Sequence, residues 1–382
     1  TIGNGPRCEH RLFYTQPRLL PRPCGEAGSW VAFLSTPITF YHGRDMAAQQ
    51  SGVSFVTTLY NKKPYLEAVC SSLQRQQGAF KHEFIFVDDG SDDGTGAEVK
   101  RLTAGWDNVT VVEQANAGAA GAHNVGAALA SMPFLKFLDG DDVLTPRATT
   151  WLLDALETTG VGWAWGNLGK YSLDRTTPDG ITSPTQVPKT PPSAEIMADP
   201  LAFFIRNIPA NSTSLLVEKA LYDRVGGCDE RLRSPDYTLF LRLAAAAPTA
   251  HVAAPVGLVP MQAPGRLSGQ KRRSRYESVL ALRYLVAETH ALSPTHRQQA
   301  MRRAVSRAWL FARRENGCGI LSSHFLRLVR SRLPWPVNAV SLITASLAAF
   351  TEDGRIQRPI AWRPPGSPPQ PFIDGDPPAT VL

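Results

Sequence analysis

Residues 84–95 read FIFVDDGSDDGT, an apolar run of strand length that stops abruptly in acidic and turn-forming residues. Two other segments repeat this pattern. Val53–Leu59 is followed by Tyr60 and Asn61, and Phe134–Leu138 is followed by Asp-Gly-Asp-Asp. Segments with helical spacing separate the three strands. This alternation of strand and helix predicts an α/β fold with a mostly parallel sheet flanked by helices.

The segments between these strands carry ordinary helix signals. One helix is expected to begin at Pro64, a favoured first-turn residue. Two more are expected over residues 96–103 and 121–131, with a strand at 109–112 between them. Beyond residue 166 the alternation weakens, and the elements expected there are a long loop at 174–192, a strand at 214–217, helices at 219–225 and 236–246, and a helical stretch over 276–332.

Composition divides the chain into four stretches. Residues 1–50 mix Pro, Gly and Arg without a sustained period, and we expect a poorly defined N-terminal extension. Residues 51–270 form the predicted α/β domain. Residues 271–350 are typical of a basic, helical C-terminal region, and residues 351–382 form a Pro-rich tail.

The overall composition excludes several classes of protein. With 43% hydrophobic and 19% charged residues, the chain can bury a sizeable core and is not expected to be disordered throughout. Its five cysteines are scattered without a C-x-x-C pair, which argues against a disulfide framework or a thiolate zinc site and favours a reducing, cytoplasmic location. Neither a membrane-spanning run nor a signal peptide is expected, and residues 333–350 are interpreted as a buried or interfacial segment.

The formal charge of +7 is unevenly distributed. Residues 271–333 carry 14 Lys or Arg against three Glu, whereas residues 51–270 carry 18 Lys or Arg against 23 Asp or Glu. Arg alternates with apolar residues over 325–333, a pattern that suits peripheral contact with the inner face of a cell membrane. A solvated helix face has the same composition, so both interpretations stay open. No nucleic-acid partner is expected, because no aromatic stacking platform accompanies the charge.

The acidic strand ends indicate a site for a metal and a diphosphate. In open α/β sheets, ligands bind beyond the carboxyl ends of the strands. Asp139 and Asp141 flank Gly140 in a tight turn, so both carboxylates can face one point. Mg²⁺ and Mn²⁺ commonly combine one or two carboxylates with substrate phosphates. The alternative is that these residues only form turns and cap helices.

Two common nucleotide-binding motifs are absent. The turn after the first strand, residues 60–64, contains no glycine to let a pyrophosphate approach, and Gly118, Gly121 and Gly126 do not have dinucleotide-binding spacing. No G-x-x-x-x-G-K-[ST] sequence occurs, which excludes P-loop chemistry.

Five segments stand out along the chain: VSFVTTLYNK from Val53, FIFVDDGSDDGT from Phe84, NAGAAGAHNVG from Asn116, FLDGDD from Phe137, and VGGCDERLRSPDYTLFLRLA from Val225. In their order and spacing, these segments resemble glycosyltransferase family 2, whose members have the GT-A fold. The resemblance implies a nucleotide-sugar-binding half at 51–165 and an acceptor-binding half at 166–270.

The resemblance also implies roles for particular residues. Thr58 and Tyr60 would flank the nucleotide base, Asp89 would bond to its ring N–H, and Asp88 would support that turn. Asn116, Gly118 and Asp139 would belong to the same nucleotide-sugar site. Asp139 and Asp141 match the metal-binding D-x-D pair, with Asp141 as the more direct ligand. Asp236 matches the general base that takes the proton of the acceptor hydroxyl.

Three positions depart from the commonest family pattern. His123 stands where Arg is usual, and Pro235 and Thr238 stand where acidic residues are usual beside Asp236. Asp236 could alternatively be only a helix cap, with Asp229 and Glu230 as the next candidate bases. If Asp236 is the base, its place at a helix N-terminus leads us to expect an ionised carboxylate at neutral pH.

The function that the resemblance implies is therefore a metal-dependent, inverting glycosyltransferase using Mg²⁺ or Mn²⁺. It would move one sugar, non-processively, from a nucleoside-diphosphate sugar, with UDP-sugars favoured, to a glycan or lipid-linked acceptor. Synthesis of cell-surface polysaccharide or lipopolysaccharide is the expected setting. The alternative is a non-catalytic glycan- or nucleotide-binding protein that retains the fold. A nucleotidyltransferase is disfavoured, because its glycine-rich loop after the first strand is missing.

Overall fold

The computed structural model describes residues 52–190, 192–262 and 271–350. The extension expected at 1–50 and the tail expected at 351–382 lie outside the described residues.

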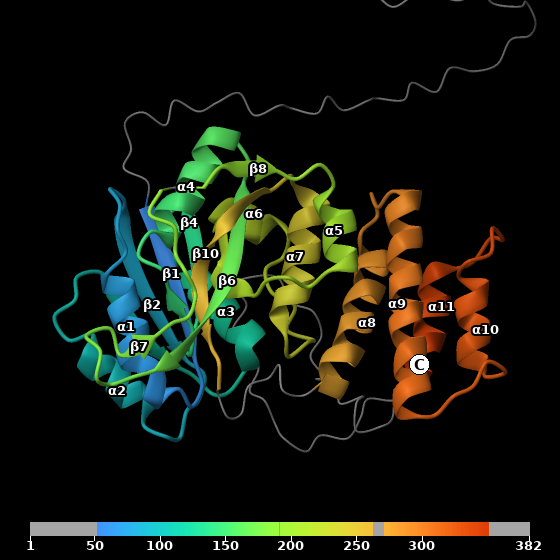
Figure 1. Cartoon of the computed structure of the whole chain (residues 1–382), viewed down its shortest axis with the longest axis horizontal. Coiled ribbons are helices and arrows are strands. Elements are labelled where there is room, and N and C mark those ends of the chain that lie inside the picture. The colour runs from blue at the N-terminus through green and yellow to red at the C-terminus, as the bar shows by residue number, and fades with distance from the viewer. Residues whose placement is uncertain (1–51, 191, 263–270, 351–382) are drawn as a thin grey trace, which may run out of the picture. The chain divides into compact units, whose positions relative to one another are not determined.

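The described residues form a ten-stranded mixed sheet (Figure 1). Along its main path the strand order is β3-β2-β1-β4-β9-β6-β10-β5, with β7 paired to β6 and β8 paired to β10. The strands are β1 (Gly52–Leu59), β2 (Lys81–Asp88), β3 (Val109–Glu113), β4 (Phe134–Asp139), β5 (Val143–Leu144), β6 (Trp163–Leu173), β7 (Ile181–Thr182), β8 (Ala194–Ile196), β9 (Leu215–Glu218) and β10 (Ala250–Pro260).

The first half of the sheet is parallel, and its register brings three strand ends together. Strand β1 lies between β2 and β4 and runs parallel to both. Leu59 is opposite Asp88, and Thr58 is opposite Asp139. The residues that follow β1, β2 and β4 therefore share one edge of the sheet, as the sequence predicts.

Helices cover both faces of the sheet, because alternate residues of the central strands face opposite sides. Phe55 of β1 belongs to a core cluster shared with α1 and α4, whereas the adjacent Val56 belongs to a second cluster shared with α3, α5 and α7. The helices of this part are η1 (Lys63–Tyr65), α1 (Leu66–Gln74), α2 (Thr95–Leu102), α3 (Gly118–Leu129), α4 (Ala148–Thr159), α5 (Pro200–Arg206), η2 (Ser212–Ser214), α6 (Lys219–Arg224) and α7 (Pro235–Ala246).

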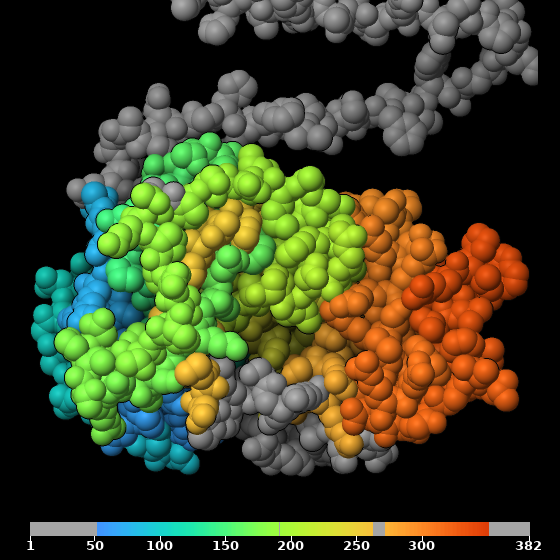
Figure 2. Space-filling model, viewed as in Figure 1, coloured from blue at the N-terminus to red at the C-terminus, as the bar shows by residue number. Residues whose placement is uncertain are grey.

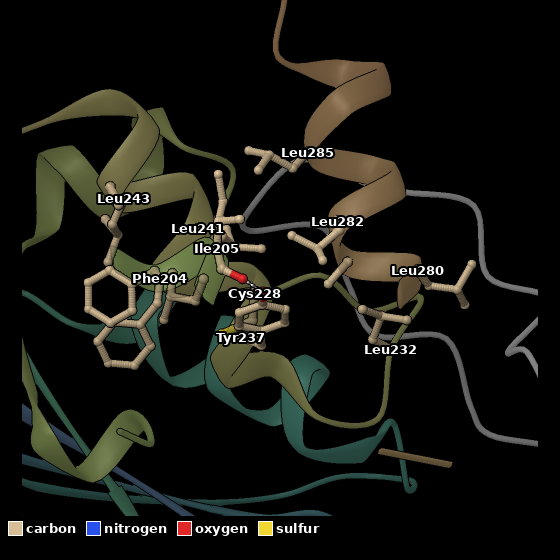
Figure 3. Close-up of a cluster of buried hydrophobic side chains, with 14 of the residues drawn as sticks. Phe204, Ile205, Cys228, Leu232, Tyr237, Leu241, Leu243, Leu280, Leu282 and Leu285 are labelled. Atoms are coloured by element: carbon tan, nitrogen blue, oxygen red, sulfur yellow. Dashed lines mark hydrogen bonds between the residues drawn. The ribbon is translucent and has the colours of Figure 1, made fainter. Parts of the chain in front are cut away.

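A helical C-terminal extension packs against α5 and α7. It comprises α8 (Lys271–Glu288), α9 (Pro294–Glu315), α10 (Ser323–Arg330), α11 (Ala339–Ser346) and η4 (Leu347–Ala349). Figure 3 shows Leu282 and Leu285 of α8 beside Leu241 of α7 in one buried cluster. In the same cluster, the hydroxyl of Tyr237 on α7 donates a hydrogen bond to the carbonyl of Ile205 on α5 at 3.1 Å, which joins the two helices that the extension covers. The extension thus shares the second core cluster and is not a separate appendage. Within the described residues, no helix combines the length and apolarity needed to cross a membrane.

Most of the predicted elements are present with boundaries shifted by a few residues, but α4, α5, β5, β7, β8, β10 and most of β6 were not expected. Strand β10 contains Pro255, which lacks the N–H that a strand interior needs. The pairing of β10 with β6 shifts register on both sides of Pro255, so the proline sits at an irregularity that tolerates it. Residues 333–350, interpreted as a buried or interfacial segment, contain α11 and end at the buried Phe350.

Candidate active site

The turn after β4 carries the predicted metal-binding pair. Gly140 N–H donates to the Thr58 carbonyl at 2.9 Å, and Asp142 N–H donates to the Asp139 carbonyl at 2.9 Å. A Cβ on residue 140 would lie 2.7 Å from a Leu59 methyl carbon and 2.8 Å from the Thr58 oxygen. Only glycine fits this close approach, so Gly140 fixes the turn that places Asp139 and Asp141 at the carboxyl end of β1.

Asp141 is held from two directions. Its Oδ2 lies 2.8 Å from Nζ of Lys62, which follows β1, and both side chains are largely shielded from solvent. Its backbone carbonyl accepts a hydrogen bond from the buried Tyr171 hydroxyl at 2.6 Å. A cationic group therefore already lies against the carboxylate that the sequence assigns to the metal.

Asp139 faces a polar segment that the sequence analysis missed, residues 211–213. Its Oδ1 accepts a hydrogen bond from the Ser212 hydroxyl at 3.0 Å, and its backbone N–H donates to Oγ1 of Thr213 at 3.2 Å. The neighbouring Asp142 accepts from Nδ2 of Asn211 at 2.8 Å and from Oγ1 of Thr213 at 2.7 Å. The available signal was the run Asn-Ser-Thr-Ser directly before the apolar residues of β9.

Asp236 reaches the same segment from the first turn of α7. Its Oδ1 accepts the backbone N–H of Ser212 at 3.0 Å. Ser212 thus contacts Asp139 through its hydroxyl and Asp236 through its backbone. The hydrogen bonds of Asp236 go to Ser212 rather than to the N–H groups of its own helix, so its role is not that of a helix cap. Figure 2 shows a hollow near the middle of the face turned toward the viewer, with atoms in the colour of the segment around α6 and α7 at its floor.

Asp236 is only partly ionised at neutral pH, contrary to the expectation of a fully ionised carboxylate. Burial and then the charge of Asp139 raise the pKa of Asp236 to about 7, against the smaller opposing effect of the hydrogen bonds from Ser212. The helix N-terminus favours the charge, but this effect is weaker than loss of solvent and a nearby carboxylate. The residue therefore titrates near neutral pH.

Two buried titratable side chains, Asp142 and Lys136, lie behind this edge. Burial, with the charges of Asp139 and Asp141, raises the pKa of Asp142 well above its usual value. Burial also lowers the pKa of Lys136, on β4, to about 7. The Lys136 ammonium donates to the Thr213 carbonyl. Asp139 and Asp141 are thus close enough to Asp142 to affect its ionisation.

Asp88 and Asp89, at the end of β2, make hydrogen bonds within their own turn and to α3. Asp88 Oδ1 accepts from the Ser91 backbone at 3.1 Å and hydroxyl at 2.5 Å. Asp89 accepts from the N–H groups of Ala117 at 2.7 Å and Gly118 at 2.6 Å. Gly118 has φ of 77°, a conformation that glycine adopts readily. Asp89 therefore holds the N-terminus of α3, whatever else it binds.

The remaining predicted nucleotide-binding residues lie around this edge. Thr58 is buried at the end of β1, and Tyr60 is half exposed just beyond it. Asn116 lies in the loop before α3, where a Cβ on Gly90 would be 3.1 Å from its backbone nitrogen. The sheet edge thus brings together residues from β1, β2, β4 and the loop before α3.

The position where the family usually has Arg is occupied by a buried histidine. His123 Nδ1 lies 2.6 Å from the carbonyl of Ala119, so this nitrogen carries the hydrogen. Its Nε2 lies 3.9 Å from Oδ1 of Asp139. Burial lowers the pKa of His123, which favours a neutral ring. His123 is a further residue facing the acidic edge.

The alternative bases are engaged elsewhere. Asp229 bonds to Arg231 at 2.6 Å and to Arg242 at 2.8 Å, and although burial opposes its charge, these arginines lower its pKa. Glu230 accepts a hydrogen bond from Asn124 at 2.9 Å. A carboxylate with a lowered pKa is a poor proton acceptor, so Asp236 is the better placed base of the two aspartates.

The donor set fits a divalent cation that shares its ligands with a substrate. Among the described residues, no group of three His, Cys, Asp or Glu side chains is arranged to hold a metal ion alone. Asp139 and Asp141 supply carboxylate oxygens, and Asp141 already attracts the Lys62 ammonium. Two carboxylates completed by diphosphate oxygens are the usual arrangement for Mg²⁺ or Mn²⁺.

Comparison with known proteins identifies the class. Three crystal structures of residues 1–349 of TarS from S. aureus share the fold; the one in complex with UDP-GlcNAc is 15% identical, with a TM-score of 0.54, over 74% of this chain and 79% of that one. The sheet with its acidic edge is therefore the GT-A fold. Residues 54–207 match the model described as Glycosyl transferase family 2, so this region of the chain is similar to that family.

Curated relatives match part of the chain. The chain is 30% identical over 125 residues to the uncharacterized glycosyltransferase EpsJ of Bacillus subtilis, covering 33% of this chain and 36% of that protein. It is 29% identical over 194 residues to an uncharacterized glycosyltransferase of Haemophilus influenzae, covering 50% and 61%. The matches thus span less than two thirds of the length of either relative.

Proposed function

We propose that this protein is a metal-dependent, inverting glycosyltransferase that moves one sugar from a nucleoside-diphosphate sugar to an acceptor hydroxyl. One observation carries the proposal: Ser212 contacts both Asp139, of the D-x-D pair, and Asp236. The carboxylate proposed to bind the metal and the carboxylate proposed as the base thus contact the same residue. Donor diphosphate and acceptor hydroxyl would have to meet near such a residue.

Asp139 and Asp141 would hold Mg²⁺ or Mn²⁺ together with the donor diphosphate. When bound, the cation would offset the negative charge that grows on the departing diphosphate. Lys62, already beside Asp141, brings a further positive charge to this position. Thr58, Tyr60, Asp88, Asp89, Asn116 and Gly118 are the proposed contacts to the nucleotide part of the donor.

Asp236 is the proposed general base. The acceptor oxygen would attack the anomeric carbon while the bond from that carbon to the diphosphate oxygen breaks, and the acceptor proton would pass to Asp236. A single displacement of this kind inverts the configuration at the anomeric carbon. A carboxyl with a pKa of about 7 is well matched to this task, because it is partly ionised at neutral pH yet basic enough to hold the proton.

The donor is proposed to be a UDP-sugar, since two of the TarS structures of the same fold are complexes with UDP-GlcNAc and with UDP. The proposed acceptor is a glycan or a lipid-linked sugar of a cell-surface polysaccharide or lipopolysaccharide. Transfer is expected to be non-processive. A ladder of products growing from one acceptor would contradict this.

A non-catalytic glycan- or nucleotide-binding protein is the second candidate. The observation in its favour is that Thr238 stands where an acidic residue is usual and donates its hydroxyl to the Pro235 carbonyl at 2.9 Å. Position 238 thus provides no second carboxyl group to assist Asp236.

A donor screen separates the two candidates. Purified protein is incubated with Mn²⁺ and a panel of nucleotide sugars, and nucleoside diphosphate release is measured with and without glycan acceptors. A transferase releases nucleoside diphosphate from at least one donor and gives a glycosylated product. A binding protein shows donor affinity by calorimetry but releases none.

A further inference from the structure

Exposed apolar side chains concentrate around α10. Thirteen large hydrophobic side chains are exposed among the described residues, and five of them lie within 320–335: Ile320, Leu321, Leu326, Val329 and Trp335. Leu321 is 93% exposed and Leu326 is 61% exposed. Single apolar residues on a surface are ordinary, but a concentration of them marks an interaction surface.

Helix α10 is attached by one face only. No residue of α10 is buried. Its inner face includes Phe325, whose ring lies 5.2 Å from that of Trp309 on α9, and Leu328, which packs against the core. Leu326 and Val329 are three residues apart and so share another face, which is exposed. Figure 1 shows α10 at the outer edge of the C-terminal helices, beside α9 and α11.

The surroundings of this apolar face are positively charged. From residue 316 to residue 350 the sequence contains no Asp or Glu but has Arg327, Arg330 and Arg332. Arg313 and Arg314 are exposed at the end of α9, just before this segment. A partner that suits the surface must therefore combine negative charge with an apolar interior.

We propose that residues 320–335 form a docking surface for a membrane rich in anionic lipid. The apolar side chains would enter the boundary between headgroups and acyl chains, while the arginines would lie at the level of the headgroups. A second copy of this chain fits less well, because pairing two such faces would bring their arginines together. The proposal does not depend on the transferase activity, although it would bring a lipid-linked acceptor close to the enzyme.

The test is sedimentation of the full chain with lipid vesicles. We expect the protein to sediment with vesicles of equal parts phosphatidylglycerol and phosphatidylcholine, to remain in solution with phosphatidylcholine alone, and to be released by high salt. Removing one arginine with Arg330→Gln should weaken binding about fivefold. Combining Leu321→Ser and Leu326→Ser should weaken it by about tenfold or more.

Matched controls come from exposed residues elsewhere. Ile196→Ser removes an apolar side chain that is 56% exposed on β8, and Arg224→Gln removes an exposed arginine at the end of α6. Both should leave vesicle binding unchanged, and circular dichroism should show all variants folded. The proposal is overturned if anionic vesicles bind no more protein than neutral ones, or if the α10 variants bind like the controls. It is also overturned if the wild-type protein binds no vesicles and is instead a dimer that the Leu326→Ser substitution dissociates.

Discussion

The ammonium of Lys62 lies 2.8 Å from Oδ2 of Asp141, where Lys62 follows β1 and Asp141 follows β4. The two residues are 79 positions apart in the sequence, and the parallel pairing of β1 with β4 brings them together. The positive charge of Lys62 thus offsets the negative charge of Asp141, the carboxylate that is proposed to bind the metal. A divalent cation and Lys62 should therefore compete for Asp141.

This competition can be measured directly. Replacing Lys62 by Met keeps much of the apolar stem and removes the charge, so the affinity for Mn²⁺ without nucleotide should rise about fivefold. Electron paramagnetic resonance titration of free Mn²⁺ gives this affinity. Lys63→Met, which alters the adjacent residue, is the control. An unchanged or lower affinity in Lys62→Met would show that the ion pair does not restrain the metal site.

Asp236→Asn tests the general base. Asparagine keeps the size of the side chain and an oxygen for the Ser212 N–H, but it cannot take up the acceptor proton. We expect donor and metal affinity close to wild type and a loss of transfer of about 10²–10⁴-fold. Calorimetry with the donor and product formation with the acceptor provide the two readouts. Transfer within a few-fold of wild type would assign the proton to another group.

The pH dependence of transfer follows from the raised pKa of Asp236, about 7. Only the ionised carboxylate can accept a proton, and below its pKa the protonated form dominates. Therefore kcat/KM should fall about tenfold per pH unit below this pKa and level off above it. Measurements between pH 5 and 9 with saturating Mn²⁺ give the profile. A profile flat across this range would contradict the assignment.

Asp89 should matter for stability apart from any contact with the nucleotide. Its carboxylate accepts hydrogen bonds from the backbone of Ala117 and Gly118 and from the side chain of Gln114. Asp89→Ala removes these bonds at the start of α3, and we expect a loss of about 2 kcal/mol in the free energy of unfolding. Urea denaturation measures this. Asp92→Ala, in the exposed part of the same turn, is the control and should change stability little.

The acidic edge can be predicted from the sequence because each strand end is visible in its own residues and parallel strands are regularly arranged. Asp139 and Asp141 follow one apolar run, Asp88 follows another, and parallel strands end at the same edge. The placement of Ser212 was not predictable in this way, since it joins Asp139 and Asp236 across 73 and 24 residues. The one local signal, the run Asn-Ser-Thr-Ser before β9, indicates a polar segment but not which residues it contacts.

The ionisation state of Asp236 could not be predicted from the sequence for a related reason. The helix N-terminus and the preceding Pro235 are visible in the sequence, and both favour a charged carboxylate. Burial and the nearness of Asp139 raise the pKa instead, and both depend on how α7 packs against the sheet. In the same way, Pro255 prevented the prediction of β10 from the sequence, because the irregular strand pairing that accommodates this proline is a property of the folded sheet.

The most direct test compares nucleoside diphosphate release by wild type and Asp141→Ala. Both proteins are assayed with the donor and acceptor from the screen, in Mn²⁺ and in excess EDTA, after circular dichroism has shown equal folding. We expect release by wild type in Mn²⁺, none in EDTA, and none by Asp141→Ala under either condition. Undiminished release by Asp141→Ala, or by wild type in EDTA, would contradict a metal-dependent transferase built on Asp139 and Asp141.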